Sequence, residues 1–125
     1  MLKFNEQKQI NDINGALGLR PQVEQIIDGL AENFDAIYYL GIGGTYASAM
    51  QAVTYINGKS KLPVYVQHAA EYYTTGNQRL TEKSIVILSS VTGTTQEVVQ
   101  AVKEIKQVGA TLIGFIDTKE SPLAQ

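Results

Sequence analysis

Short apolar runs alternate along this chain with longer segments of helical periodicity, and this pattern leaves few folds open. Four runs are rich in β-branched and aromatic residues and are bounded by turn residues, which is typical of buried strands. They comprise residues 36–40, 64–67, 84–89 and 111–116. Strands that alternate with helices form right-handed βαβ units. The chain is therefore predicted to be an α/β protein, with a three-layer open parallel sheet in the flavodoxin-like strand order 2-1-3-4.

Three other segments carry apolar residues at helical spacing. The first predicts a helix over about 21–33, because Pro21 suits a first helical turn. The second follows Thr45, the expected N-cap, and ends at Asn57-Gly58. The third starts with a capping box at Thr94 and ends at Gly109. The inner faces of the second and third helices are expected to carry Ala49, Met50, Val53 and Ile56, and Val98, Val99, Val102 and Ile105.

The two ends of the chain give weaker signals. Residues 1–18 are polar, with Asn14-Gly15 as an expected turn, and predict only an arm or a short helix. Ser121-Pro122 has the form of a helix start, yet the sequence reaches Gln125 before that helix completes a second turn. We therefore expect an arm and helix over 1–34, and a domain over 35–125 that is truncated before its fifth strand.

Composition argues against several classes of partner. The formal net charge is −2 and the 10 Lys and Arg residues are scattered, so nucleic acid is not expected. No apolar run approaches the ~20 residues of a membrane-spanning helix, and the polar start of the chain does not resemble a secretory signal. A cytoplasmic protein without a membrane partner is expected. The sequence has no cysteine and one histidine, His68, so neither a thiolate metal site nor a histidine-based metal cluster is expected. No cofactor is predicted.

Two loops carry the strongest functional signal. Gly41-Ile42-Gly43-Gly44-Thr45-Tyr46 follows the first predicted strand, and Ser90-Val91-Thr92-Gly93-Thr94-Thr95 follows the third. These strands are neighbours where the strand order reverses, which is where open parallel sheets bind ligands. Small residues at a helix start offer a phosphate backbone amides, hydroxyls and the positive end of the helix dipole. One anion is therefore expected between the loops, held by neighbouring amides and by the hydroxyls of Thr45, Ser90, Thr92 and Thr95.

Other known loop types need residues that this chain lacks. A dinucleotide-binding fingerprint requires a third glycine where Tyr46 stands, and an acidic residue where Gln67 and His68 are found. A Walker loop requires Gly-Lys-Ser/Thr, which is also absent from the sequence. Two simpler roles stay open, because glycines also allow tight packing of a strand against a helix, and Thr94 alone suits a helix cap.

Four motifs together resemble one known family. The Leu40 to Tyr46 segment looks like the Gly-Thr-Ser turn of sugar-isomerase (SIS) domains, and the Ser90 to Thr95 segment resembles their Ser-x-Ser-Gly-x-Thr phosphate loop. Ala70-Glu71-Tyr72 is similar to the Ser/Ala-Glu-Phe after the family's second strand, and Ser121-Pro122-Leu123 to the Ser-x-Leu after its fourth. The motifs keep the family's order and spacing over about residues 35–124, with Gly44 replacing the usual hydroxyl residue and Thr92 the usual serine.

The resemblance implies sugar-phosphate binding. The residues that it assigns to the phosphate are Gly43, Gly44, Thr45, Ser90, Val91, Thr92, Gly93 and Thr95. Within the family, the polar arm and the Asp-Ala-Ile-Tyr-Tyr strand look most like fructoselysine- or glucoselysine-6-phosphate deglycases, near the isomerase half of glucosamine-6-phosphate synthase. The implied protein is a homodimeric phosphosugar isomerase or ketoamine-6-phosphate deglycase with two SIS halves, of which this chain is the first. The family's main acid–base groups lie largely in the second half or in a neighbouring subunit, so this domain alone is expected to bind without turnover.

Two other hypotheses belong to different classes. SIS domains also serve as sugar-phosphate sensors in transcription regulators, but such a regulator would carry a basic helix-turn-helix before the domain. Residues 1–20 are neither long enough nor basic enough for that. A non-catalytic scaffold is the third hypothesis, and it predicts no phosphate ligand.

Two titratable residues near the predicted sheet edge are weak catalytic candidates. Glu71 is placed to contact a sugar hydroxyl or to assist proton transfer, but it is equally suited to the start of a helix. His68 is a candidate acid or base, or a structural residue at a strand end. The tyrosines of the predicted strands, Tyr38, Tyr39 and Tyr65, are expected in the core, whereas Tyr72 and Tyr73 are expected to pack on a partner subunit or on a missing segment.

Overall fold

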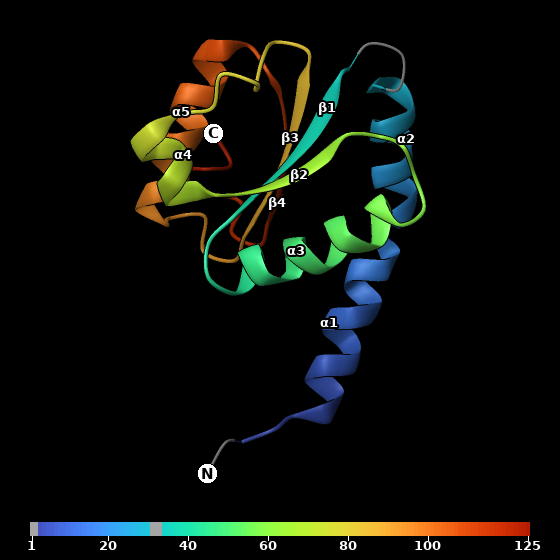
Figure 1. The fold of residues 1–125 in the computed structure, drawn as a ribbon. Helices are drawn as coiled ribbons and strands as arrows, with labels where there is room; N and C mark the ends of the chain where they lie inside the picture. The colour runs from blue at the N-terminus through green and yellow to red at the C-terminus, as the bar shows by residue number, and fades with distance from the viewer. Residues whose placement is uncertain (1–2, 31–33) are drawn as a thin grey trace. The chain divides into compact units, whose positions relative to one another are not determined.

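Four parallel strands form one sheet in the computed structural model, which describes residues 3–30 and 34–125 (Figure 1). The strands are β1 (Ala36–Gly41), β2 (Val64–His68), β3 (Ser84–Ser90) and β4 (Thr111–Ile116). Their spatial order is β2-β1-β3-β4, so β1 and β3 occupy the centre. The predicted α/β class and strand order are confirmed.

Helices cover both faces of this sheet. The helix α3 (Gly44–Asn57) contacts β1 and β2 on one face, whereas α4 (Ala69–Thr75) and α5 (Gln96–Val108) contact each other on the other face (Figure 1). The main core lies under α4 and α5. It includes Tyr38, Leu40, Val86, Val98 and Ile105, none of which is more than 3% exposed.

The burial of each strand follows from its place in the sheet. Central β3 is buried at five of its seven positions, which explains its nearly continuous apolar sequence. Edge strand β2 is buried only at Val64. Tyr65 on β2 is therefore 43% exposed, and its predicted place in the core is wrong. Tyr72 is 4% exposed within the α4 core, so the predicted contact with a partner subunit or a missing segment is wrong for this tyrosine.

Two helices precede the sheet and belong to a separate compact unit that ends before Phe34. They are α1 (Glu6–Gly18) and α2 (Arg20–Leu30). The predicted turn at Asn14-Gly15 is wrong, because α1 continues through both residues. Asn5 caps α1 by accepting a hydrogen bond from the Lys8 amide. The predicted helix over 21–33 corresponds to α2 over its described part, and residues 31–33 lie outside the described residues.

The structure corrects two predicted helix starts. The N-cap residues of α3 and α5 are Gly43 and Thr95, whereas Thr45 and Thr94 were the predicted caps. At the other ends, α3 stops at Asn57 with Gly58 as its C-cap, and left-handed Gly109 ends α5, both as expected. Met50 is 47% exposed, so its predicted inward position on α3 is wrong within the described residues.

Candidate functional site

The loops after β1 and β3 leave the sheet from adjacent strands at the same edge. Leu40 pairs with Leu88 in the parallel register, so Gly41 and Ser90 end their strands within two residues of this pair. The strand order reverses here, because β2 lies on the far side of β1 and β4 on the far side of β3. The topology therefore brings together the two loops that the sequence singled out.

The loop after β1 packs tightly against α3 at Gly41 and borders open space at Gly43 and Gly44. A Cβ atom at Gly41 would lie 2.6 Å from the Tyr46 backbone nitrogen, so this glycine allows α3 to pack directly on the strand end. A Cβ atom at Gly43 or Gly44 would meet no described atom within 4 Å. The tight-packing role thus applies to Gly41, whereas the following two glycines border open space.

The Thr45 hydroxyl is used inside its own loop. It accepts a hydrogen bond from the Ile42 amide (3.1 Å) and donates one to the Ile42 carbonyl (2.9 Å). The Thr45 hydroxyl proton is therefore already used in a hydrogen bond within the loop. The first-turn amides of α3 have no acceptor within the helix, so the backbone is the main source of donors on this side of the site.

The loop after β3 keeps its hydroxyl protons available. The Ser90 hydroxyl, 7% exposed, accepts a hydrogen bond from the Gly93 amide at 3.0 Å. The Thr92 hydroxyl accepts one from the Thr94 amide (3.3 Å) and another from the Thr94 hydroxyl (2.9 Å). Because both oxygens act as acceptors in these bonds, each can still donate its own proton to a ligand. Within the described residues the Thr95 hydroxyl has no hydrogen-bond partner, so it is a third free donor.

The C-terminal segment, residues 117–125, forms hydrogen bonds with this loop. The Leu123 amide donates to the Gly93 carbonyl (3.3 Å), and the Thr118 hydroxyl donates to the Val91 carbonyl (3.3 Å). Ser121 is 2% exposed, and its hydroxyl has no hydrogen-bond partner in the described structure. Residues 117–125 contain turns instead of the helix that Ser121-Pro122 predicted. Their role is to hold Gly93 and Val91 in place, while the Val91 side chain is 70% exposed.

The two helices that start at this edge lack side-chain caps, unlike two other helices of the protein. Asn5 caps α1, and His68 caps α4 by accepting a hydrogen bond from the Ala70 amide at 3.3 Å. Neither Gly43 nor Thr95 makes such a bond within the described structure. Both helix starts therefore present unpaired amides and a positive dipole end, which is the electrostatic requirement of an anion site.

The two weak catalytic candidates have structural places in or beside α4. The His68 Nδ1 atom accepts the hydrogen bond from the Ala70 amide that caps α4. The ring also contacts Tyr46 edge to face, with centroids 5.2 Å apart. Glu71 is exposed in the first turn of α4, where a carboxylate stabilises the helix dipole. The helix-start role therefore accounts for Glu71 in this fold.

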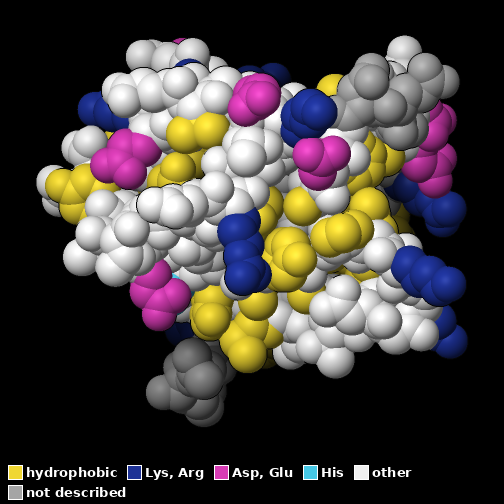
Figure 2. Space-filling view, turned by 45° about the horizontal axis from the view of Figure 1, so that its top comes forward, with side chains coloured by type: hydrophobic (Ala, Val, Ile, Leu, Met, Phe, Trp, Pro, Cys, Tyr) yellow, Lys and Arg dark blue, Asp and Glu magenta, His cyan; other side chains and the backbone are white. Residues whose placement is uncertain are grey.

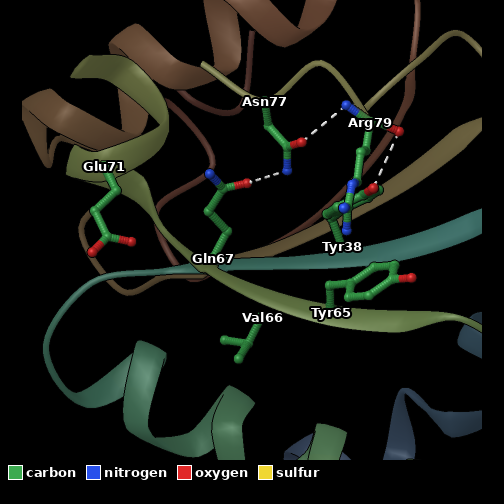
Figure 3. A pocket seen from close by; sticks show the side chains of 7 residues that line it. All are labelled: Tyr38, Tyr65, Val66, Gln67, Glu71, Asn77 and Arg79. Atoms are coloured by element: carbon green, nitrogen blue, oxygen red, sulfur yellow. Dashed lines mark hydrogen bonds between the residues drawn. The ribbon is translucent and has the colours of Figure 1, made fainter. Parts of the chain in front are cut away.

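A hollow of about 370 Å³ opens on the face of the sheet that α4 covers (Figure 3). Its lining residues come from β1, β2, α4 and the following loop: Tyr38, Tyr65, Val66, Gln67, Glu71, Asn77 and Arg79. Sequence reasoning did not single out Asn77 or Arg79. Only the polarity of the loop after α4 marks them, and such polarity is common in surface loops.

Burial raises the pKa of the Tyr38 phenol above its ordinary value of 10.0, with a contribution from Tyr65, while the Arg79 guanidinium opposes this shift. Burial also raises the pKa of Tyr39 and, together with the Glu104 carboxylate, that of Tyr72. The unfolded chain thus releases these protons at a lower pH than the folded protein. The stability linked to the neutral phenols is present below pH 10.0 and is lost as the pH rises towards the folded values.

We therefore expect the free energy of unfolding to fall as the pH rises above about 10. The Tyr72→Phe variant should show a smaller fall than the wild type, because it removes one of the linked protons. Urea unfolding at pH 8, 10 and 11 measures the difference. Tyr73→Phe, at a 50% exposed position, is the matched control and should behave like the wild type. An equally steep loss in Tyr72→Phe would contradict this assignment.

Other kinds of site find no support in the described residues. Residues 3–30 and 34–125 contain no group of three or more His, Cys, Asp or Glu side chains placed to hold a metal ion. None of the helices described is long and apolar enough to cross a membrane. Figure 2 shows basic and acidic side chains scattered over the visible face, with no continuous basic patch on that face.

Comparisons with known proteins agree with the fold. The family model described as "SIS domain" matches residues 32–125. The isomerizing glutamine–fructose-6-phosphate aminotransferase of Pyrococcus horikoshii is 29% identical over 120 residues, which are 94% of this chain and 19% of that enzyme. This chain spans less than a fifth of the length of the curated relatives it matches.

Solved structures of other proteins show the same fold. A Bacillus subtilis protein assigned as a phosphosugar isomerase is 30% identical, with a TM-score of 0.77 over 84% of this chain and 33% of that one. The C-terminal domain of glucosamine-fructose-6-phosphate aminotransferase from Francisella tularensis is 21% identical, with a TM-score of 0.69. That match covers 80% of this chain and 28% of the other, and at this identity it is evidence for the fold alone.

Proposed function

Because the chain belongs to the SIS domain family, we propose that it binds the phosphate of a phosphorylated sugar between the β1–α3 and β3–α5 loops. The observation that carries this proposal is the pair of uncapped helix starts beside neighbouring strand ends. The relatives named as phosphosugar isomerase and as fructose-6-phosphate aminotransferase support a sugar phosphate as the ligand.

The geometry favours backbone amides over the full set of predicted hydroxyls. Gly43 and Gly44 border open space, which lets a phosphate approach the first-turn amides of α3 closely. From the other loop, the hydroxyls of Ser90, Thr92 and Thr95 have protons to donate. Thr45 shapes its loop instead of contacting the ligand, since its proton is bonded to Ile42. Val91 and Gly93 contribute the backbone curve that carries these donors.

For the whole protein we propose a phosphosugar isomerase or a ketoamine-6-phosphate deglycase that acts as a cytoplasmic homodimer. The domain over 35–125, preceded by the arm and helix of 1–34, would be the first of two SIS halves. This rests on the lengths of the relatives, since the chain covers only 33% of the Bacillus subtilis structure. A sugar-phosphate sensor is the second candidate. Glu71 and His68 have structural roles here, so we propose that the acid–base groups lie elsewhere in the assembly.

The sharpest test places a carboxylate where the phosphate should bind. Gly44→Asp adds a negative charge to the first turn of α3, where a Cβ atom has room. The free protein should be unchanged or up to about 1 kcal/mol more stable, because an acidic residue favours this helix end. Binding of glucose-, fructose- or glucosamine-6-phosphate should weaken at least about tenfold through charge repulsion. Calorimetric titration and thermal unfolding measure the two effects separately.

Gly44→Asn is the matched control, since it has a similar shape without the charge and should keep most of the affinity. For the wild type, a ligand at a hundredfold excess over its Kd should raise stability by about 2.7 kcal/mol. Unphosphorylated sugars and inorganic phosphate show which part of the ligand is recognised. Equal affinity in Gly44→Asp and Gly44→Asn would refute a phosphate site at this helix start.

A further inference from the structure

The hollow beside β2 is built by a chain of hydrogen bonds that reaches from the sheet to the loop after α4. The Tyr38 hydroxyl donates to the Arg79 carbonyl at 3.1 Å, and the Arg79 amide donates to the Asn77 side-chain oxygen at 3.0 Å. The Asn77 side-chain nitrogen then donates to the Gln67 side-chain oxygen at 2.8 Å. Figure 3 shows these bonds crossing the hollow from Gln67 to Tyr38. The loop is thereby held at a fixed position over the strands.

The floor of the hollow is aromatic. The Tyr38 and Tyr65 rings stack with centroids 5.2 Å apart and an interplanar angle of 29°. Tyr38 is buried, whereas Tyr65 is 43% exposed and offers ring surface to a ligand. Figure 3 shows the Val66 side chain on the opposite side of β2 from Gln67, so Val66 borders the hollow with its backbone. An aliphatic chain could pack on the ring face of Tyr65 without entering the core.

The hollow has a positively charged group at one end and a negatively charged group at the other. The Arg79 guanidinium lies on the side of the tyrosines, and Glu71 lies at the other end, beyond Gln67 (Figure 3). Neither side chain forms an ion pair with any residue in 3–30 or 34–125. Gln67 uses its side-chain oxygen for Asn77, so its side-chain N–H groups can donate to a ligand. Figure 3 shows the Gln67 nitrogen on the side of Glu71 and its oxygen on the side of Asn77. A positive end at Arg79 and a negative end at Glu71 thus share one concave surface.

We propose that this hollow binds a small zwitterion, a molecule with a carboxylate at one end and an ammonium group at the other. The carboxylate would accept hydrogen bonds from the Arg79 guanidinium, the ammonium group would pair with Glu71, and the carbon chain would cover Tyr65. Its volume of about 370 Å³ is within the range of small-molecule sites. The hollow shares no lining residue with the phosphate loops, so the proposal stands apart from the proposed function.

A nitrogen-15 NMR titration with 6-aminohexanoate tests this directly. The side-chain amide signals of Gln67 and Asn77 lie in the hollow and should shift along a saturable curve. Hexanoate and hexylamine each carry one of the two charges, and at equal ionic strength both should bind about tenfold more weakly or worse. Arg79→Gln and Glu71→Gln should each remove the advantage of the zwitterion. Lys83→Gln, an exposed charge outside the hollow, is the matched control and should leave the titration unchanged.

The outcomes separate the two sites of the protein. Saturable shifts of Gln67 and Asn77 that disappear in Arg79→Gln, in a protein that keeps its melting temperature, would support the proposal. Equal binding of the zwitterion and its one-charge analogues, or no shift of either amide, would overturn it. The Gly44→Asp variant should titrate like the wild type, so failure of the phosphate site and failure of this site can be distinguished.

Discussion

Replacing Gly93 by alanine is expected to lower the free energy of unfolding by about 3 kcal/mol or more, the largest effect that the structure predicts. The added Cβ atom would lie at 2.1 Å from the Ser121 hydroxyl oxygen and 2.4 Å from its Cβ atom, in a place that is already filled. Gly93 also has a φ of +64°, which disfavours any residue with a Cβ atom. Urea denaturation of the variant and the wild type measures the loss.

Ser121 allows the two causes of this loss to be separated. In the Gly93→Ala background, Ser121→Gly removes both close atoms and should restore part of the stability, leaving about 1 kcal/mol of backbone cost at position 93. Ser121→Ala keeps its Cβ atom at 2.4 Å and should restore little. Made alone, Ser121→Ala should be close to neutral, because it removes a buried hydroxyl that has no described partner. Equal rescue by both changes would argue against the steric explanation.

Gly41→Ala is expected to cost about 2 to 3 kcal/mol and to weaken sugar-phosphate binding as well. Here the new Cβ atom would meet backbone, at 2.6 Å from the nitrogen and 2.8 Å from the Cα atom of Tyr46. No rotamer change relieves a contact with backbone, so the first turn of α3 must move away from β1. That turn supplies the amides of the proposed site, and a displaced turn should therefore lower both stability and affinity.

Thermal unfolding with and without fructose-6-phosphate measures the two effects of Gly41→Ala together. A loss of this size should lower the melting temperature by on the order of 10 °C in a domain this small. Gly44→Ala is the matched control three residues later, where a Cβ atom meets no described atom within 4 Å. It should leave stability nearly unchanged. A similar loss in both variants would show that α3 is sensitive to any substitution at its start, against the close-approach argument.

The sheet could be predicted well because its signal is repeated along the chain. Four apolar runs of strand length that alternate with helical segments allow few arrangements, and the right-handed crossover rule reduces them further. Burial of single side chains was less predictable. Tyr65 and Tyr38 look alike as strand residues, but β2 is an edge strand and β1 a central one, so only Tyr38 is buried. A residue's neighbours across the sheet are not a local property of its sequence.

The predicted N-caps of α3 and α5 were wrong for a related reason. Thr45 and Thr94 have the spacing of caps, yet their hydroxyls bond to Ile42 and Thr92 inside the loops. Local hydrogen bonds of this kind compete with capping, and sequence spacing does not decide between them. The two loops themselves were identified correctly as neighbours, because strand order alone brings them together. The hollow beside β2 depends on Asn77 and Arg79 folding back over the sheet, which no local pattern indicates.

The starts of α3 and α5, which have no side-chain caps, also affect how the domain moves. Amides without an acceptor exchange their hydrogens with solvent readily, whereas those of central β3 exchange only when the sheet opens. A bound phosphate would supply hydrogen-bond acceptors to the first-turn amides of α3 and α5, which have none within their helices. Both helix ends would then fray less, although separate parts of the sequence form them. The ligand would in this way act as a structural part of the domain, joining the motions of two helices that contact the sheet from opposite sides.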